Sequence, residues 1–201
     1  PMPCYAYIAT SLDGFIARPD GGLDWLDAAQ TRITPPEDCG YADFMQGIDA
    51  LVMGRNTYEK VRSFTPWPYD KPVYVLSRSL NELPDAPAGV QLFRGTPAEL
   101  VSHAASQGQP RLYIDGGLTV QSIIAADLLD EITITRVPVL LGEGLPLFGP
   151  LSFSGSFSSS DAEQTAVQLR HLSTRSWDFG LVQSHYALEN TPQTAPENKK
   201  A

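Results

Sequence analysis

Two glycine turns in the sequence combine residue types that could bind an anionic ligand. In the first turn the apolar run 50–53 leads into Gly54, and in the second the run 112–114 leads into Gly116 and Gly117. Each turn joins a predicted strand to a predicted helix, and the free amides and partial positive charge of a helix N-terminus favour anions. Glycine also lets a ligand approach the backbone closely. Two such turns in one small domain indicate a nucleotide that carries a pyrophosphate.

Basic side chains that could assist such a ligand are few. The chain has 14 Lys and Arg residues against 23 Asp and Glu, a net charge of −9. An acidic surface disfavours general binding to nucleic acid or to an anionic membrane. An anionic small molecule would therefore need a locally basic pocket, for which Arg55 and Arg78 are the candidates.

Composition indicates one globular domain without a metal centre. The 201 residues are 42% hydrophobic and 18% charged, in the range of folded domains that bury a sizeable core. The two cysteines, Cys4 and Cys39, lack the spacing of a zinc site or a disulfide framework, and the three histidines show no ligand spacing. We expect isolated buried thiols and no metal. No apolar run approaches the roughly 18 residues of a membrane span, and no signal peptide is evident, so we expect a cytoplasmic protein.

Strand and helix patterns alternate through most of the chain, and only strand patterns follow. The strand patterns cover residues 5–12, 50–53, 73–76, 90–93, 111–115, 132–141, 167–172 and 181–188. We predict a helix at 56–62, where Asn56 and Glu59 have capping-box spacing, and another after Thr96, with Pro97 and Glu99 in its first turn. This order predicts an α/β, three-layer domain with a mainly parallel central sheet, helices on both faces and a C-terminal antiparallel hairpin. The domain spans 1–188, and the polar segment 189–201 is predicted to be a disordered tail.

Five stretches, 8–14, 52–59, 75–78, 113–117 and 138–148, together resemble a known family. They occur in the order found in the dihydrofolate reductase-like superfamily. The resemblance is closer to the C-terminal reductase domain of the bifunctional riboflavin-biosynthesis deaminase/reductase and its stand-alone relatives. It implies a homodimeric reductase that transfers a hydride from NADPH to a small heterocyclic or imine substrate, ribosylaminopyrimidine-like or pterin-like. The zinc-deaminase motifs His-x-Glu and Pro-Cys-x-x-Cys are absent from this sequence, so we do not expect the deaminase activity.

The resemblance also implies a set of cofactor-binding residues. The phosphates would be held at the first helix by Gly54, Arg55 and Thr57, and the pyrophosphate would pass over Gly116, Gly117, Leu118 and Thr119. The 2′-phosphate would meet Ser77 and Arg78, since a guanidinium fork suits that group. The nicotinamide would be flanked by Ala9 and Ile16.

The source of the proton is open at this level. Reduction of a carbon–nitrogen double bond is helped by a positioned acid. The resemblance favours Asp13, although Asp13-Gly14 is also an ordinary turn sequence; Asp24, Asp27 and a bound water are the alternatives. A second function is open as well, a non-catalytic nucleotide- or ligand-binding module with the same fold.

Overall fold

An eight-stranded sheet forms the centre of the protein in the computed structural model, which describes residues 2–149 and 166–189. The strands of this sheet are β1 (Cys4–Ser11), β3 (Ala50–Gly54), β4 (Val73–Leu76), β5 (Val90–Phe93), β6 (Leu112–Asp115), β7 (Leu129–Val137), β9 (Leu169–Ser176) and β10 (Val182–Leu188). Two short strands, β2 (Phe15–Ala17) and β8 (Leu145–Pro146), pair separately. The helices are α1 (Asp24–Gln30), α2 (Tyr41–Gln46), α3 (Arg55–Arg62), α4 (Pro97–Ser106) and α5 (Gly117–Ala125).

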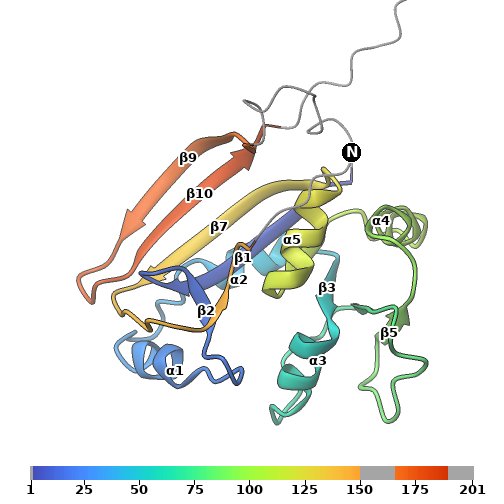
Figure 1. Cartoon of the computed structure of the whole chain (residues 1–201), viewed down its shortest axis with the longest axis horizontal. Coiled ribbons are helices and arrows are strands. Elements are labelled where there is room, and N and C mark those ends of the chain that lie inside the picture. Colours follow the sequence, from blue (N-terminus) through green and yellow to red (C-terminus); the bar gives the residue numbers. More distant parts are fainter. Residues whose placement is uncertain (1, 150–165, 190–201) are drawn as a thin grey trace, which may run out of the picture.

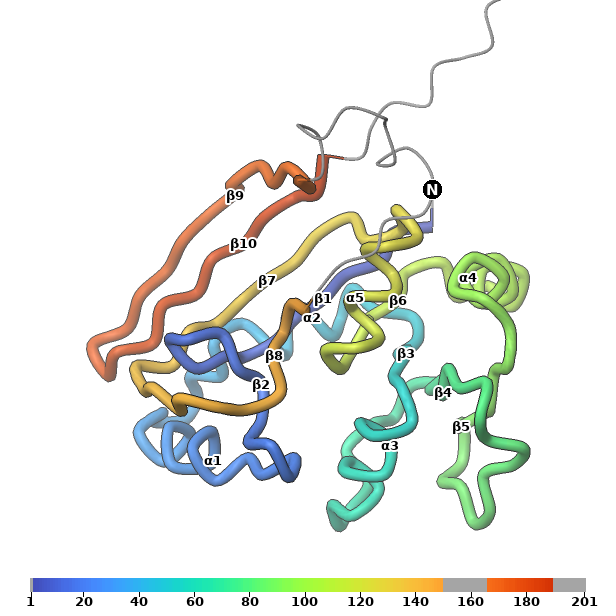
Figure 2. Tube along the Cα trace, in the orientation of Figure 1, coloured from blue at the N-terminus to red at the C-terminus, as the bar shows by residue number. Residues whose placement is uncertain are grey.

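The strand order is β5-β4-β3-β6-β1-β7-β10-β9 (Figures 1 and 2). All pairs from β5 to β7 are parallel, whereas β10 runs antiparallel to both β7 and β9. The parallel pairs need crossover connections, which the helices supply, and the hairpin needs only a tight turn. The predicted three-layer α/β fold with a C-terminal antiparallel hairpin is therefore confirmed.

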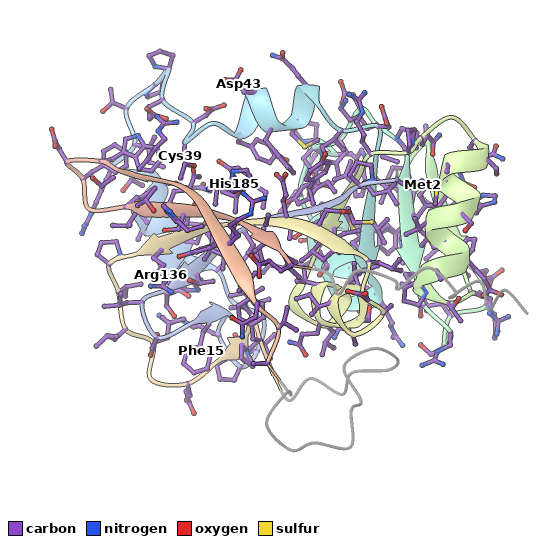
Figure 3. The ribbon with its side chains drawn as sticks, turned by 90° about the horizontal axis from the view of Figure 1, so that it is seen from above. Met2, Phe15, Cys39, Asp43, Arg136 and His185 are labelled. Atoms are coloured by element: carbon purple, nitrogen blue, oxygen red, sulfur yellow. The ribbon has the colours of Figure 1, made fainter. Side chains whose placement is uncertain are left out.

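Helices cover both faces of the parallel part of the sheet. Apolar residues of α4 and α5 pack on one face with side chains such as Ala6 and Val52, and α2 and α3 pack on the other with Leu51 and Tyr113. All four residues 50–53 of β3 are fully buried, as expected for a strand that is covered on both faces. Figure 3 shows Asp43 of α2 and Phe15 of β2 on opposite sides of the sheet.

One of the two predicted capping boxes is present. Thr96 caps α4, with its side chain bonded to the Glu99 amide and the Glu99 carboxylate bonded back to the Thr96 amide. The predicted capping box of α3 is wrong, because the helix begins at Arg55 with Gly54 as its N-cap and no side-chain cap. Glu59 instead bonds to the Arg55 side chain, N–O distance 2.8 Å. The glycine turn runs directly into the helix and leaves the first amides of α3 without a side-chain cap.

Other boundaries differ modestly from the predictions. The predicted strand 132–141 begins earlier and ends at Val137, before Pro138, which cannot donate to a strand ladder. The two cysteines are free and buried, as predicted. None of the helices in the described part of the chain has the length and apolar character needed to cross a membrane. The predicted tail 189–201 lies outside the described residues beyond Glu189.

Candidate active site

The predicted site residues follow the carboxyl ends of neighbouring parallel strands. Strands β4, β3, β6 and β1 lie side by side in that order, and Gly54 pairs with Leu76 while Met53 pairs with Asp115. The segments that leave these strands therefore share one edge of the sheet. In open α/β sheets this edge is where ligands bind. We call it the carboxyl edge.

The two glycine turns interlock at the carboxyl edge. A β-carbon added to Gly54 would lie 2.8 Å from the hydroxyl of Thr119, and one added to Gly116 would overlap the hydroxyl of Thr57. Each threonine therefore occupies the space that the glycine of the other turn leaves free. Gly116 also has a φ of 93°, a backbone angle that residues other than glycine rarely adopt. The N-termini of α3 and α5 are thereby brought together, and α5, like α3, has no side-chain cap.

A small antiparallel pair, β2 with β8, lies over the second turn. A β-carbon on Gly117 would lie 3.0 Å from both the side chain of Ile16 and the carbonyl of Pro146. Gly117 is thus under the β2–β8 pair, with half-buried Ile16 against it. The predicted neighbours Ala9 and Leu118 differ in exposure: Ala9 is half-buried in β1, whereas the Leu118 side chain is 74% exposed beside the turn.

Two arginines meet at the outer end of the carboxyl edge. Ser77 follows β4, and its amide donates to the carbonyl of Phe93 at 3.1 Å. The side chain of Arg78 is exposed, and the backbone carbonyl of Arg78 accepts a 3.4 Å hydrogen bond from the side chain of Arg94. Arg94 was not among the predicted residues, since nothing in its local sequence distinguishes it from a surface arginine. Arg55 lies apart from them at the start of α3, paired with Glu59.

Asp13 is held in the turn between β1 and β2. Its carboxylate accepts hydrogen bonds from the Ser11 hydroxyl (2.6 Å) and from the amides of Leu141 (3.2 Å) and Gly142 (2.8 Å). These donors lower the pKa of the carboxyl, the Ser11 hydroxyl most strongly. A lowered pKa keeps the group ionised at neutral pH, which is the opposite of what a general acid needs.

The two alternative acids on α1 are exposed. Asp24 forms an ion pair with Arg18, N–O distance 2.6 Å, and this hydrogen bond lowers the pKa of Asp24. Asp27 lies on the solvent side of the same helix. Trp25 between them packs into a cluster with Val137 and Leu181.

Asp115 is a candidate acid that the sequence interpretation missed. It ends β6 immediately before Gly116, and burial raises its pKa to about 6, opposed by hydrogen bonds from the Gly116 amide and the Tyr69 hydroxyl. Raised carboxyl pKa values are characteristic of groups that donate protons near neutral pH. The signal available in the sequence was a carboxylate directly between a buried strand and the double glycine.

Tyrosine side chains surround Asp115. The charge of Asp115 contributes to raised pKa values at Tyr41, Tyr69 and Tyr113, where burial is the larger cause. Tyr113 donates a 2.9 Å hydrogen bond to the carbonyl of Tyr7, and the Tyr7 ring lies 5.9 Å from the Tyr41 ring. The result is an aromatic wall beside a carboxyl group, suited to a flat ring with polar edges. We call Tyr7, Tyr41, Tyr69, Tyr113 and Asp115 the tyrosine chamber.

No metal site accompanies this arrangement in the described residues. Within residues 2–149 and 166–189, no three His, Cys, Asp or Glu side chains are grouped so that they could hold an ion.

A family model and a known protein both match most of this chain. Residues 5–181 match the family described as the RibD C-terminal domain. The chain is 36% identical over 171 residues to YwjB of Bacillus subtilis, an uncharacterised protein; the match covers 83% of this chain and 95% of YwjB.

Solved structures extend the comparison to three dimensions. A Shewanella sp. PV-4 protein with a provisional riboflavin-biosynthesis name is 39% identical, with a TM-score of 0.81 over 94% of this chain and 99% of that one. Dihydrofolate reductase from Enterococcus faecalis is 19% identical, with a TM-score of 0.58 over 92% of this chain and 96% of the reductase. At that identity the second likeness concerns the fold alone.

Proposed function

Because the chain belongs to the family of RibD C-terminal domains, we propose that it is an NADPH-dependent reductase that reduces a carbon–nitrogen double bond in a small heterocycle. The observation that carries the proposal is the interlocking of the two glycine turns through Thr57 and Thr119. It supports a pyrophosphate-binding cradle, because two uncapped helix N-termini converge where side chains are excluded. The substrate class is a ribosylaminopyrimidine-like or pterin-like ring.

In this proposal the residues at the carboxyl edge bind successive parts of NADPH. Gly54, Arg55 and Thr57 on one side and Gly116, Gly117, Leu118 and Thr119 on the other would hold the pyrophosphate. Ser77 and Arg78 would bind the 2′-phosphate, with Arg94 as a further cation beside them. Ala9 and Ile16 would flank the nicotinamide, which supplies the hydride when it is bound. The protein then has to align donor and acceptor carbons and exclude water.

The proton comes from Asp115 in this proposal rather than from Asp13. When a hydride adds to the carbon of a C=N bond, the electron pair of the π bond moves to nitrogen, which takes up a proton. A carboxyl with a pKa of about 6 is partly protonated near neutral pH, whereas Asp13 has a lowered pKa and is ionised there. A water held by Asp115 would deliver the same proton without direct contact.

The tyrosine chamber would position the substrate ring. Burial raises the pKa of each tyrosine hydroxyl, so these groups stay neutral. Tyr7, Tyr69 and Tyr113 already donate, to the Cys39 carbonyl, to Asp115 and to the Tyr7 carbonyl, so their oxygens would accept hydrogen bonds from the ring N–H groups of a substrate. Tyr7 and Tyr41 supply aromatic surface next to Asp115. A heterocycle with polar edges matches both features.

A thermal-shift titration with NADPH and NADH in parallel tests the cofactor. A ligand that binds only the folded state at about 100 times its Kd raises the Tm of a protein of this size by roughly 5 to 10 °C. Selective stabilisation by NADPH is the expected result, and pyrimidines and pterins are then screened for oxidation of NADPH. Absence of a shift with both nucleotides refutes the proposal; NADPH binding without turnover of any ring supports the non-catalytic module instead.

We propose that the protein is a cytoplasmic homodimer. A homodimer is implied by the family resemblance, and strand β9 offers an exposed sheet edge with Leu169 and Leu172 exposed. Sedimentation that shows only monomer at micromolar concentration would refute the homodimer.

The two free, buried cysteines are compatible with a reducing compartment, and we propose a cytoplasmic location.

A further inference from the structure

A cavity lies away from the glycine turns, between α2 and the hairpin side of the sheet. Its volume is about 400 Å³, within the range of small-molecule sites. The floor consists of side chains that alternate onto one face of β1, β7, β10 and β9, and the roof is the segment 39–48. In Figure 3, Cys39 and His185 of this cavity lie on the α2 side of the sheet, opposite Arg136. We call it the α2 cavity.

The charged groups that line the α2 cavity are already paired. His185 bonds to Glu131 at 2.7 Å, and Arg111 forms a bidentate pair with Asp49, shortest distance 2.8 Å. A ligand in the cavity therefore meets no uncompensated positive charge. A phosphate or carboxylate would instead be placed near the Glu131 carboxylate, at a cost in Coulomb energy and desolvation.

The polar groups that remain free in the cavity are neutral. The side-chain NH₂ group of Gln183 donates hydrogen bonds to the Tyr7 hydroxyl, the Cys39 carbonyl and the Thr135 hydroxyl, at 2.8 to 3.0 Å. In contrast, within the described residues no hydrogen bond is formed by the side-chain carbonyl of Gln183 or by three lining hydroxyls. These hydroxyls belong to Tyr5, Thr133 and Ser173. Hydroxyl groups both donate and accept, so they match a ligand that does the same.

We propose that the α2 cavity binds a neutral polyhydroxylated molecule, a polyol or an unphosphorylated sugar group. Three free hydroxyls and one free amide oxygen are spread over four adjacent strands, which suits a ligand with several hydroxyls in a row. This site is distinct from the hydride-transfer site, since neither Asp115 nor the glycine turns line it.

The ligand has two possible sources with the same chemistry. The rings of Tyr7 and Phe44 stack at 4.7 Å and line the α2 cavity, and Tyr7 also belongs to the tyrosine chamber. The cavity could therefore receive either a free polyol or the hydroxylated extension of a ring bound in the chamber. The second source depends on the proposed reductase function, and the first does not.

Histidine NMR signals provide a direct test of binding in the full chain. His185 lines the α2 cavity, whereas His103 on α4 contacts Tyr74 and Phe93 and serves as an internal control. Titration with ribitol is expected to shift the ring signals of His185 and to leave those of His103 unchanged. Ribitol 5-phosphate is expected to bind at least tenfold more weakly. No shift at His185, equal shifts at both histidines, or equal affinity for the phosphate would overturn the proposal.

Substitutions locate the binding groups. Ser173→Ala and Thr133→Val each remove one free hydroxyl and are expected to weaken ribitol binding about threefold to tenfold. Ser102→Ala removes an exposed hydroxyl on α4 and is the matched control. Ser173 lies on an exposed edge strand, so that variant folds even if Thr133→Val does not. Unchanged affinity in Ser173→Ala and in a folded Thr133→Val would refute the assignment.

An N-ribityl aminopyrimidine distinguishes the two sources, with and without NADPH. If it shifts His185 and displaces ribitol, the cavity receives the extension of the substrate. If it leaves His185 unchanged while ribitol still binds, the cavity serves a separate polyol. Both results retain the proposed site, and because ribitol binding is measured without cofactor, it can succeed when the reductase proposal fails.

Discussion

The carboxylate of Asp13 accepts a 2.8 Å hydrogen bond from the amide of Gly142, 129 residues later in the chain. Together with the bonds from Ser11 and Leu141, this ties the turn after β1 to the segment that precedes β8. Since β8 pairs with β2, the same ties fix the position of Ile16 over Gly117. Asp13 thus acts as an anchor for the strand pair that covers the second glycine turn.

The first prediction concerns Asp13→Asn. The folded-state pKa of Asp13 is lowered, so its contribution to stability is present above the ordinary aspartate pKa and is lost as the pH falls through the lowered folded value. The variant should therefore lose stability at neutral pH and show a smaller decrease below pH 4. Because Asp13 is ionised at neutral pH, kcat should fall by less than the 10²-fold typical of a lost general acid. Urea unfolding from pH 3 to 7 and kcat measure the two effects; a larger loss of kcat in a folded variant would restore Asp13 as the acid.

The second prediction concerns Asp115→Asn. Between the ordinary aspartate pKa of 3.8 and the folded pKa of about 6, the native state binds more protons than the unfolded state, so stability falls as the pH rises. Above that window the ionised carboxyl costs up to about 3 kcal/mol. The amide keeps a carbonyl that accepts from the Gly116 amide, so the variant should be more stable than the parent at pH 8.

Although Asp115→Asn should be more stable than the parent at pH 8, its activity should be lower. Loss of the acid is expected to lower kcat about 10²- to 10⁴-fold and to abolish the decline of kcat above pH 6. Asp27→Asn, on the solvent side of α1, is the matched control and should change neither quantity. Unchanged kcat in Asp115→Asn would transfer the proton step to water or to another group.

The third prediction compares alanine substitutions at Gly54 and Gly116, which should differ in whether they can be rescued. Gly54 has an ordinary φ of −82°, so Gly54→Ala suffers only from contact with the Thr119 hydroxyl, and Thr119→Ala in the same chain should restore folding. Gly116→Ala is strained by its φ of 93° as well as by Thr57, so Thr57→Ala should not restore it. Thermal unfolding with and without NADPH measures both pairs. Equal rescue of the two glycine variants would contradict the interlocked geometry.

The sequence predicted the fold and the two strand-to-helix glycine turns because their signals are local. Alternating strand and helix patterns determine the layers, and the capping box at Thr96 and the double glycine are visible within a few residues. Residue chemistry at the site is less local. The pKa of Asp115 depends on burial and on Tyr69, and the hydrogen bonds of Asp13 come partly from residues 141 and 142. The false capping box at Asn56 arose because the spacing of two residues says nothing about where the preceding strand ends.

The last prediction tests the outer end of the carboxyl edge. Arg78 and Ser77 follow β4, and a 2′-phosphate distinguishes NADPH from NADH. Arg78→Ala should weaken NADPH binding by about tenfold to a hundredfold, because charge-assisted hydrogen bonds are lost, and should leave NADH binding unchanged. Arg62→Ala, at the far end of α3, removes the same charge away from this edge and is the control. Calorimetric titration of both nucleotides measures the ratio of their affinities. If Arg78→Ala weakens NADPH and NADH equally, Arg78 contacts a part that the two nucleotides share, and the 2′-phosphate must lie elsewhere.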